Sequence, residues 1–376
     1  MTVKAMYVLS GDPLTNGHID IVKRARETFG SLLVALAINP GKKYTYDLQE
    51  REGLTRKALL GLDITIDSYS GHTIDYAKLN GIKTIIRSAR GSADFDFEKM
   101  LNDVGKSQEQ GIETVLFFAR QNMSHISSSA VKELQRLHGS IHEYVPFVIK
   151  ESLEKKISNQ RLIGLTGEIG AGKSFVAQTI ISSNAYNTNF HEIDMDKLGH
   201  EILSTNNKPM FIGVRENLIK TFGVSVQLPN EIVPRINIKA LGSIIFSSTS
   251  ARETFNALMS DPMLTLYREK LIGLEGTIFV SSALFAEAGI GYLTNHNVIL
   301  VHADKAVREQ RLYKRGYSSE EVQKRMGAQL DYDSKREILR QQNIKHKYGT
   351  LTTIDNTDKN PVQIITELES ILHVKN

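Results

Sequence analysis

Gly167-Glu168-Ile169-Gly170-Ala171-Gly172-Lys173-Ser174 follows the apolar run Leu162-Ile163-Gly164-Leu165 and opens a segment with helical periodicity. Glycines at these positions let successive backbone N–H groups turn inward around the phosphates of a nucleotide. Lys173 adds a cation that reaches the β- and γ-phosphates, and the Ser174 hydroxyl can hold Mg²⁺. A glycine-rich turn without a ligand is the alternative. The strand before the loop and the helix after it favour a nucleoside triphosphate site.

Similar apolar runs recur along the whole chain. Short, partly β-branched runs alternate with helical patterns at residues 5–9, 31–38, 64–69, 84–87 and 114–119. A second series begins at residue 162 and continues near residue 193 and at 277–280, 298–301 and 351–354. This alternation is typical of a parallel α/β sheet, so the sequence predicts two such sheets.

The boundary between the two series is a charged segment. Residues 150–160 are helix-prone and carry few apolar side chains, and a chain of 376 residues is long enough for two domains. We therefore expect one domain at residues 1–150, a linker at 151–160 and a second domain at 161–376.

Composition excludes several classes of function. The chain has 46 basic and 42 acidic residues, a net charge of +4, without the dense basic stripe of a nucleic-acid binder. It has no cysteine, which excludes disulfides, thiolate nucleophiles and sulfur-based zinc sites and suits a reducing cytoplasm. Its most apolar long window, residues 271–293, contains Glu275, Glu287 and several glycines, and the N-terminus lacks a long apolar signal core. We expect a cytoplasmic protein with neither nucleic acid nor a membrane as a partner.

The loop Ser10-Gly11-Asp12-Pro13-Leu14-Thr15-Asn16-Gly17-His18 joins the first strand to the first helix. Open α/β sheets bind ligands beyond the carboxyl ends of their strands, where this loop lies. Gly17 permits close approach, and His18 stands near the start of the helix, which we expect to begin there. Three more loops offer cations or helix-start donors for a polyphosphate: Lys42, Arg87 with Arg90, and Ser127-Ser128-Ser129.

These residues resemble the nucleotidylyltransferase superfamily, and within it bacterial phosphopantetheine adenylyltransferase. The resemblance rests on Thr15 to His18, Asp12-Pro13, Lys42, Arg87 with Arg90, Asp94-Phe95 with Glu98, and Ile126 to Ser129 with Val131-Lys132-Glu133. It implies a Rossmann-like fold and transfer of an adenylyl group from ATP to 4′-phosphopantetheine. It implies catalytic roles for His18, Lys42 and Arg90. The implied ATP ligands are Ser10, Gly17, His18, Arg90, Glu98, Ser127, Ser128 and Ser129, and the implied phosphopantetheine ligands are Ser10, Lys42, Thr73, Arg87 and Glu133.

The first half departs from that family at three places. Leu9 and Ser88 add side chains where the family has glycine, which would crowd the nucleotide if those positions needed a positive φ. The pair Val104-Gly105 replaces a Met-Asn pair that faces pantetheine in the family. The pair Val104-Gly105 leaves room for an acceptor other than phosphopantetheine.

Behind the phosphate loop, Asp194 and Asp196 end the next apolar run. Phosphorylation of an alcohol needs a carboxylate to accept the proton, and either aspartate is suitable. Alternate residues at a strand end need not face the same way, and a helix cap near Lys197 is the structural alternative for either one.

The second half resembles dephospho-coenzyme A kinase over residues 161 to about 372. The resemblance rests on residues 164–174, Asp194 with Asp196, Arg311 with Arg315, Ser318 with Glu320-Glu321, Arg325, Gln329 and Ile354-Asp355-Asn356. It implies a P-loop kinase fold with a helical lid. Gly167, Gly170, Ala171, Gly172, Lys173, Ser174, Arg311 and Arg315 would bind ATP, Lys173 and Asp196 would be catalytic, Asp194 and Asp196 would bind substrate, and Ser174 would hold Mg²⁺. Asp261 departs from the family's histidine, and residues 283–287 depart from its Pro-Leu-Leu-Phe-Glu segment.

The two resemblances support each other, because the product of the first reaction is the substrate of the second. We therefore expect a bifunctional enzyme that completes coenzyme A synthesis with ATP, 4′-phosphopantetheine and dephospho-coenzyme A as small-molecule substrates. Mg²⁺ is implied for both steps, and the hexamers of the first family imply a homo-oligomer through the N-terminal domain. Two alternatives stay open: degenerate sites that sense nucleotides, and a nucleotidyltransferase–kinase fusion with another substrate.

Overall fold

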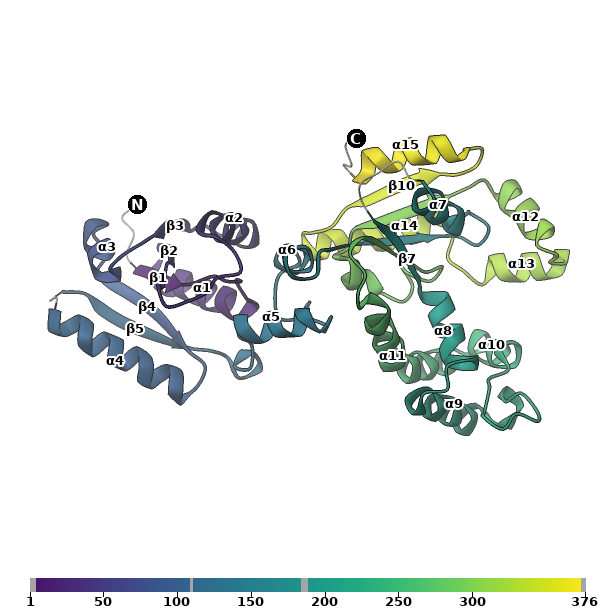
Figure 1. Cartoon of the computed structure of the whole chain (residues 1–376), viewed down its shortest axis with the longest axis horizontal. Coiled ribbons are helices and arrows are strands. Elements are labelled where there is room, and N and C mark those ends of the chain that lie inside the picture. Colours follow the sequence, from purple (N-terminus) through teal and green to yellow (C-terminus); the bar gives the residue numbers. More distant parts are fainter. Residues whose placement is uncertain (1–4, 109–110, 184–188, 373–376) are drawn as a thin grey trace. The chain divides into compact units, whose positions relative to one another are not determined.

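The computed structural model describes residues 5–108, 111–183 and 189–372. The chain divides into two compact units, Met1–Ser158 and Asn159–Asn376. Each unit has its own five-stranded sheet with helices packed on both faces, as Figure 1 shows. The α/β fold with two parallel sheets that the sequence predicts is thereby confirmed.

The first sheet has the strand order β3-β2-β1-β4-β5, and every neighbouring pair is parallel. Its strands are β1 (Ala5–Leu9), β2 (Leu32–Ala37), β3 (Thr65–Tyr69), β4 (Thr84–Ala89) and β5 (Glu113–Phe118). Its helices are α1 (Asn16–Phe29), α2 (Leu48–Ala58), α3 (Thr73–Leu79), α4 (Ser92–Gln108), α5 (Ser128–Arg136) and α6 (Phe147–Ser158), with a 3₁₀ turn at Gln121–Met123. The order reverses beside β1, so the loops after β1 and β4 diverge there and leave room for a ligand.

Strand β1 is the centre of the first unit. All five of its residues are buried, as expected for a parallel strand covered on both faces. Tyr7 and Leu9 pack into a core with α1 and α6, while Met6 and Val8 pack into a second core on the opposite face.

The second sheet has the order β10-β9-β6-β8-β7 and is also parallel throughout. Its strands are β6 (Gln160–Gly167), β7 (Phe190–Asp194), β8 (Gly276–Ser281), β9 (Val298–His302) and β10 (Leu351–Asp355). The helices are α7 (Lys173–Ile181), α8 (Met195–Ser204), α9 (Pro209–Phe222), α10 (Ile238–Ser247), α11 (Thr249–Leu271), α12 (Lys305–Lys314), α13 (Ser319–Gly327), α14 (Tyr332–His346) and α15 (Pro361–Leu372), with 3₁₀ turns at Val224–Val226 and Ile290–Thr294.

Close packing against β6 explains why residue 164 is glycine. Gly164 lies against the ring of Phe285, and a Cβ at residue 164 would come within 2.6 Å of Phe285 Cζ. Phe285 is fully buried in the core that α8, α9 and α11 share with one face of the sheet. Helices α7 and α15 cover the other face. The central strand β6 therefore has a glycine where Phe285, from the segment after β8, packs against it.

The expected linker at residues 151–160 is wrong. Residues 147–158 form α6, which packs on α2 and α5 inside the first unit, and β6 begins at Gln160. Ile149 and Leu153 are fully buried in the core of the first unit, and the Nζ of Lys150 donates to Glu154 at 2.5 Å within the helix. The segment resembles a solvated linker in sequence because its charged residues are numerous. Two of them, Lys150 and Glu154, are nevertheless buried as a pair.

Among the helices that the structure describes, none is long and apolar enough to cross a membrane. The long apolar window around residues 271–293 contains the end of α11, β8 and the turns after it. Its strand is buried in the centre of the second sheet, as the sequence predicts.

Candidate active sites

The loop after β1 is held by a buried carboxylate. Asp12 is 6% exposed and accepts hydrogen bonds from the backbone N–H groups of Thr45 and Tyr46, and from Lys132 Nζ at 2.7 Å. These bonds tie the loop to the segment before α2 and to α5. No role was predicted for Asp12 from the sequence, and its place in the loop after a buried strand is the signal that marks it.

His18 lies in the first turn of α1, which begins two residues earlier than predicted. Thr15 caps the helix, its Oγ1 accepts from His18 N at 3.4 Å, and its backbone N–H donates to His18 Nδ1 at 3.0 Å. Because Nδ1 accepts this bond, the proton of the neutral ring is on Nε2. Burial, together with Arg90 and Lys42, lowers the pKa of His18 from 6.5 to about 4. The ring is therefore neutral at pH 7 and has one N–H donor on its outer edge.

Lys42 lies close to the loop after β1. Its Nζ is 3.4 Å from Ser10 Oγ, although the two residues belong to the loops after β2 and β1. Arg51 is buried at 1% exposure and donates to the backbone oxygens of Ser10 and Ala37 at 2.6 and 3.2 Å. Its guanidinium also lies 4.0 Å from the ring centre of Tyr44. Arg51 was not predicted from the sequence, because its place in the polar helix α2 does not reveal its burial.

The other predicted phosphate ligands start two further helices. Arg90 follows β4, and its guanidinium pairs with Asp94 at 2.8 Å. Ser127 caps α5 by accepting from the N–H of Ala130, and Ser128 donates to the carbonyl of Pro13 at 2.8 Å. Ser129 is exposed. The bond to Pro13 brings the start of α5 next to the loop that carries His18.

A cavity of about 330 Å³ lies between β4, α3 and α4. Arg87 and Glu98 face each other in it, with Nε and Oε2 3.5 Å apart, and Thr73 lines it at the start of α3, where its Oγ1 accepts from Tyr69. Burial raises the pKa of Glu98, and the nearby Arg87 opposes that shift. Thr73 and Arg87, both predicted as phosphopantetheine ligands, thus line the same cavity. The structure places Glu98, predicted with ATP, in the same cavity.

Not all of the predicted ligands and departures in the first unit lie at this cavity. Glu133 is exposed on α5, where it pairs with Arg136, and it is not among the residues that line the cavity. Leu9 is packed in the core and Ser88 accepts or donates a hydrogen bond with Tyr7, and neither is among the described residues with a positive φ. The positive φ on which the expected crowding of the nucleotide depends is therefore not found at these two positions. Val104 lines the cavity, whereas the surroundings of Gly105 lie outside the described side chains.

In the second unit the phosphate loop joins β6 to α7 as predicted. Gly170 and Gly172 have φ values of +81° and +94°. A Cβ at Gly167 would lie 2.3 Å from the carbonyl oxygen of Val301 in β9. These positions need glycine because other side chains are strained at such φ values or lack room there. The loop therefore has the backbone form in which N–H groups can surround a phosphate.

Two side chains hold the loop from outside. Arg311 donates to the carbonyl oxygens of Gly170 and Ala171 at 3.2 and 3.1 Å, and Asn356 donates to that of Ala171 at 2.8 Å. Burial lowers the pKa of Arg311. Its guanidinium is thus occupied by the loop backbone here, while Arg315 at the end of α12 is exposed. The predicted direct contact of both arginines with ATP stays a prediction.

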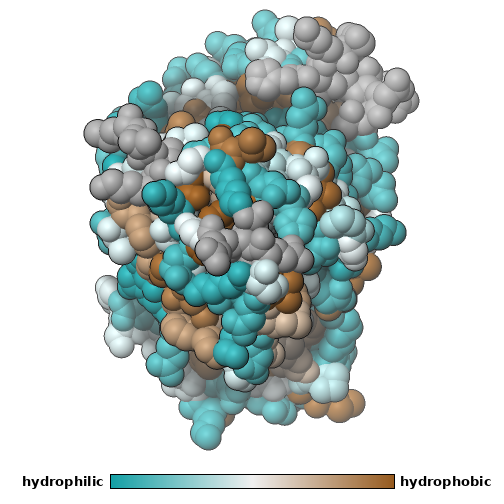
Figure 2. Space-filling model, turned by 90° about the vertical axis from the view of Figure 1, so that its left-hand side faces the viewer, coloured by the Kyte–Doolittle hydropathy of each residue, from teal (hydrophilic) through white to brown (hydrophobic). Residues whose placement is uncertain are grey.

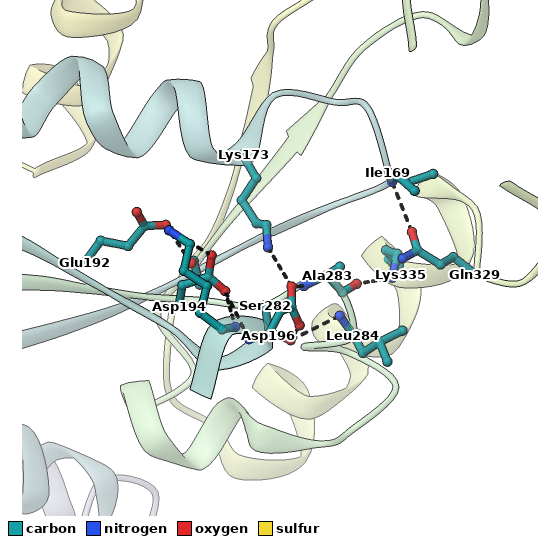
Figure 3. Close-up of polar contacts among 12 residues, drawn as sticks. Ile169, Lys173, Glu192, Asp194, Asp196, Ser282, Ala283, Leu284, Gln329 and Lys335 are labelled. Carbon is teal, nitrogen blue, oxygen red and sulfur yellow. Dashed lines mark hydrogen bonds and ion pairs between the residues drawn. The ribbon is translucent and has the colours of Figure 1, made fainter. Parts of the chain in front are cut away.

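The two aspartates have different surroundings, which Figure 3 shows. Asp194 caps α8: its Oδ1 accepts from the N–H groups of Asp196 and Lys197 at 3.0 and 3.2 Å. Asp196 points toward the phosphate loop, and its Oδ2 accepts from Lys173 Nζ at 3.1 Å. The alternative of a helix cap thus holds for Asp194, and Asp196 is the carboxylate beside the lysine of the loop.

The segment after β8 completes this arrangement. Ser282 Oγ donates to Asp196 Oδ1 at 3.1 Å, and the N–H of Ala283 donates to Oδ2 at 3.0 Å. From the segment between α13 and α14, Gln329 Oε1 accepts from the N–H of Ile169 at 3.0 Å. Gln329 was part of the resemblance drawn from the sequence. Ser282 was not predicted, although it directly follows β8, the strand beside β7.

A buried ion pair anchors the start of the phosphate loop. Glu168 is 8% exposed and pairs with Arg308 of α12 at 2.9 Å. The Nδ1 of His302, at the end of β9, lies 3.6 Å from the same carboxylate. These residues connect the loop to α12 and β9, and the sequence pattern gave no functional signal for them.

Comparison with known proteins agrees with this division. The dephospho-CoA kinase family matches residues 161–343, and the cytidylyltransferase-like family matches residues 10–134. The phosphopantetheine adenylyltransferase of Desulfosudis oleivorans is 36% identical over 154 residues, 41% of this chain and 92% of its own length. That of Carboxydothermus hydrogenoformans is 40% identical over 157 residues, 40% of this chain and 97% of its own.

One solved structure, the crystal structure of TT1252 from Thermus thermophilus, aligns over 57% of this chain and 97% of its own with 27% identity and a TM-score of 0.44. The matches to sequence families, one for each half, confirm the two resemblances drawn from the motifs. In its first unit the chain belongs to the phosphopantetheine adenylyltransferase family, and its second unit matches the dephospho-CoA kinase family over residues 161–343.

Proposed function

We propose that this chain is a bifunctional enzyme of coenzyme A synthesis. The first unit transfers the adenylyl group of ATP to 4′-phosphopantetheine, giving dephospho-coenzyme A and pyrophosphate. The second phosphorylates the ribose 3′-hydroxyl of that product with a second ATP. The observation that carries the proposal is the union in one chain of relatives of two enzymes whose reactions are consecutive.

In the first reaction the acceptor phosphate attacks the α-phosphorus of ATP. This nucleophile is already ionised, so the chain has to align the reactants and neutralise charge on the α-phosphate and the leaving pyrophosphate. The Nε2–H of neutral His18 donates to an α-phosphate oxygen. Lys42 and Ser10, 3.4 Å apart, hold the acceptor phosphate, and Arg90 with the start of α5 receives the other ATP phosphates.

The cavity beside β4 is the proposed site for the pantetheine arm. Its volume of about 330 Å³ is in the range of small-molecule pockets. Arg87 lies at its polar side, while Leu101, Ile112 and Val104 give it apolar walls. The pantetheine arm, which has a phosphate at one end and apolar and amide groups along its length, matches this lining.

In the second reaction Asp196 accepts the proton of the ribose hydroxyl as that oxygen attacks the γ-phosphorus and ADP leaves. Lys173 lies 3.1 Å from Asp196, and in the proposed mechanism its ammonium group neutralises charge on the γ-phosphate during transfer. Asp194 keeps α8 in position by capping it and does not take part in proton transfer. We also propose that α12 and α13, with Arg315, form the lid that shields this transfer from water.

Mg²⁺ is proposed for both steps, and the second unit offers a suitable ligand. The Ser174 hydroxyl is exposed at the start of α7, and within the described part of the chain it makes no side-chain hydrogen bond. A hydroxyl beside a phosphate loop is a hard oxygen ligand of the kind that Mg²⁺ prefers. When bound with ATP, the ion neutralises charge on the β- and γ-phosphates.

The experiment is to incubate the pure chain with 4′-phosphopantetheine, ATP and Mg²⁺ and to follow the products by mass. Wild type gives coenzyme A. His18→Ala leaves 4′-phosphopantetheine unreacted but still phosphorylates added dephospho-coenzyme A, whereas Lys173→Ala accumulates dephospho-coenzyme A. Wild type that makes neither product contradicts the proposal, and the two alternatives, a nucleotide sensor or a different acceptor, then become the better explanations.

We further propose that the chain self-associates through its first unit in the cytoplasm, where ATP is supplied. On the face of this unit that Figure 2 shows, apolar side chains form patches in a largely hydrophilic surface. Helix α4 exposes Phe97 and Met100 by 55% and 52%, and edge strand β5 exposes Phe118, which stacks on Phe95.

Light scattering tests this self-association. Wild type should have a multiple of the mass of one chain, and the variant Met100→Lys/Phe118→Lys should have the mass of a single chain. A monomeric wild type contradicts this proposal.

A further inference from the structure

Lys335 is a fully buried lysine outside the set of residues assigned to either reaction. It lies in α14 and is 0% exposed. Its Nζ donates to the carbonyl oxygen of Ala283 at 2.8 Å and pairs with the carboxylate of Glu287. A buried ammonium group is costly unless it is paired and hydrogen-bonded, so this position needs both partners.

The partner carbonyl belongs to the segment that holds Asp196. The N–H of Ala283 donates to Asp196 Oδ2, the oxygen that also accepts from Lys173, and Ser282 Oγ donates to Asp196 Oδ1. Figure 3 shows this chain of contacts from Lys335 through Ala283 to Asp196. Both oxygens of the carboxylate are therefore oriented by two adjacent residues of one short loop.

The peptide between Ala283 and Leu284 is fixed at both of its polar atoms. Its oxygen accepts from Lys335 Nζ, and its N–H donates to Ser282 Oγ at 3.2 Å. Because the Ser282 oxygen accepts this bond, its own proton is directed to Asp196. A cation on the carbonyl polarises the peptide and strengthens the N–H donor at its other end. Lys335 thus acts on the carboxylate through the peptide and the serine hydroxyl.

The segment that precedes Lys335 also touches the phosphate loop. Gln329 accepts from the N–H of Ile169, and the N–H of Leu330 donates to Glu287 at 3.4 Å. Residues 329–335 therefore lie against both the loop that binds triphosphate and the loop that orients Asp196. The contacts of residues 329–335 therefore set the position of the phosphate loop relative to the 282–284 loop.

We propose that Lys335 is a positioning residue for the kinase reaction, which holds the 282–284 loop so that Asp196 keeps the orientation needed to accept the hydroxyl proton. This proposal rests on the proposed kinase function of the second unit. Lys335 itself does not touch the reactants. Its contribution therefore falls on the rate of the chemical step and not on the binding of either substrate.

The test compares Lys335→Met with Lys345→Met, the same change at an exposed lysine of the same helix. The full chain is assayed with added dephospho-coenzyme A, and its adenylyltransferase activity is measured as an internal control. Lys335→Met should lower the kinase kcat by about 10- to 100-fold, since small misplacements of catalytic groups have effects of this size. KM for both substrates and the adenylyltransferase rate should stay within about threefold, and Lys345→Met should match wild type.

A double variant separates positioning from folding. Lys335→Met/Glu287→Gln removes the opposite charge as well, so any thermal stability that Lys335→Met loses through the unpaired, exposed carboxylate of Glu287 should return. Its kcat should stay low, because the bond to Ala283 is still missing. A kcat that recovers with stability, or a Lys335→Met variant with wild-type kcat, overturns the inference. Wild type without kinase activity refutes the proposed function instead.

Discussion

Asp194 and Asp196 are two residues apart, and their backbone environments give them different tasks. Asp194 uses Oδ1 on the free N–H groups at the start of α8, whereas Asp196 faces Lys173, Ser282 and Ala283. The sequence left the choice of base open, because it depends on which residue caps the helix. Which aspartate caps the helix is visible once β7, α8 and the loop after β8 are assembled, and our proposal of Asp196 as the base rests on that difference.

Substitution by asparagine distinguishes the two aspartates. Asp196→Asn should lower the kinase rate by roughly 10²- to 10⁴-fold, the usual contribution of a general base, with little change in thermal stability. Asp194→Asn should keep most activity, because asparagine caps helices as well as aspartate does. Steady-state kinetics with dephospho-coenzyme A measures both. Equal losses in the two variants would show that the assignment of the base is wrong.

His18 gives a prediction about pH. Its pKa is lowered from 6.5 to about 4 because the ring is partly buried and because the positive charges of Arg90 and Lys42 disfavour a second cation there. Below its unfolded pKa the unfolded chain binds a proton that the folded chain does not. The free energy of unfolding of the first unit should therefore fall as the pH drops from about 6.5 to about 4, with no contribution from His18 above that range. An NMR titration of the ring, assigned with His18→Asn, should have its midpoint near pH 4; a midpoint near 6.5 contradicts the account.

Among the elements, α6 departs most from the sequence-based prediction. Its Lys, Glu and Ser residues are typical of a solvated linker, yet Ile149 and Leu153 are buried and Lys150 pairs with Glu154. Apolar anchors spaced along a charged helix are a weak signal, and the partner surface on α2 and α5 is not visible in the local sequence. The glycine-rich loop, in contrast, was predictable because its glycines, lysine and flanking elements are all local.

Leu153→Ala tests whether α6 is part of the first unit. Loss of a fully buried leucine side chain should lower the free energy of unfolding of that unit by about 2–5 kcal/mol, whereas the same change in a linker has almost no effect. Urea unfolding, followed through the adenylyltransferase activity, gives this value. Lys155→Ala, an exposed position of the same helix, is the control and should stay within about 0.5 kcal/mol of wild type.

For the whole chain, the sequence predicted two parallel sheets and two phosphate-binding sites. The sheets were predictable from the repeated apolar runs, and the sites were predictable because each lies in a loop that follows a buried strand. It did not reveal the buried groups that hold those loops, such as Arg51, Arg308 and Lys335, which are charged and resemble surface residues until the helices pack. The contacts of these side chains come from distant segments. They therefore depend on the tertiary fold and not on any motif.

The central claim is that one chain carries out two consecutive phosphoryl-group reactions. The most direct measurement supplies 4′-phosphopantetheine with ATP labelled with ³²P at either the α- or the γ-phosphate, and locates the label in the coenzyme A formed. The account predicts that α-label enters the diphosphate bridge and that γ-label enters the 3′-phosphate, from which a 3′-phosphatase releases it. Product that lacks either label, or no coenzyme A at all, would contradict it.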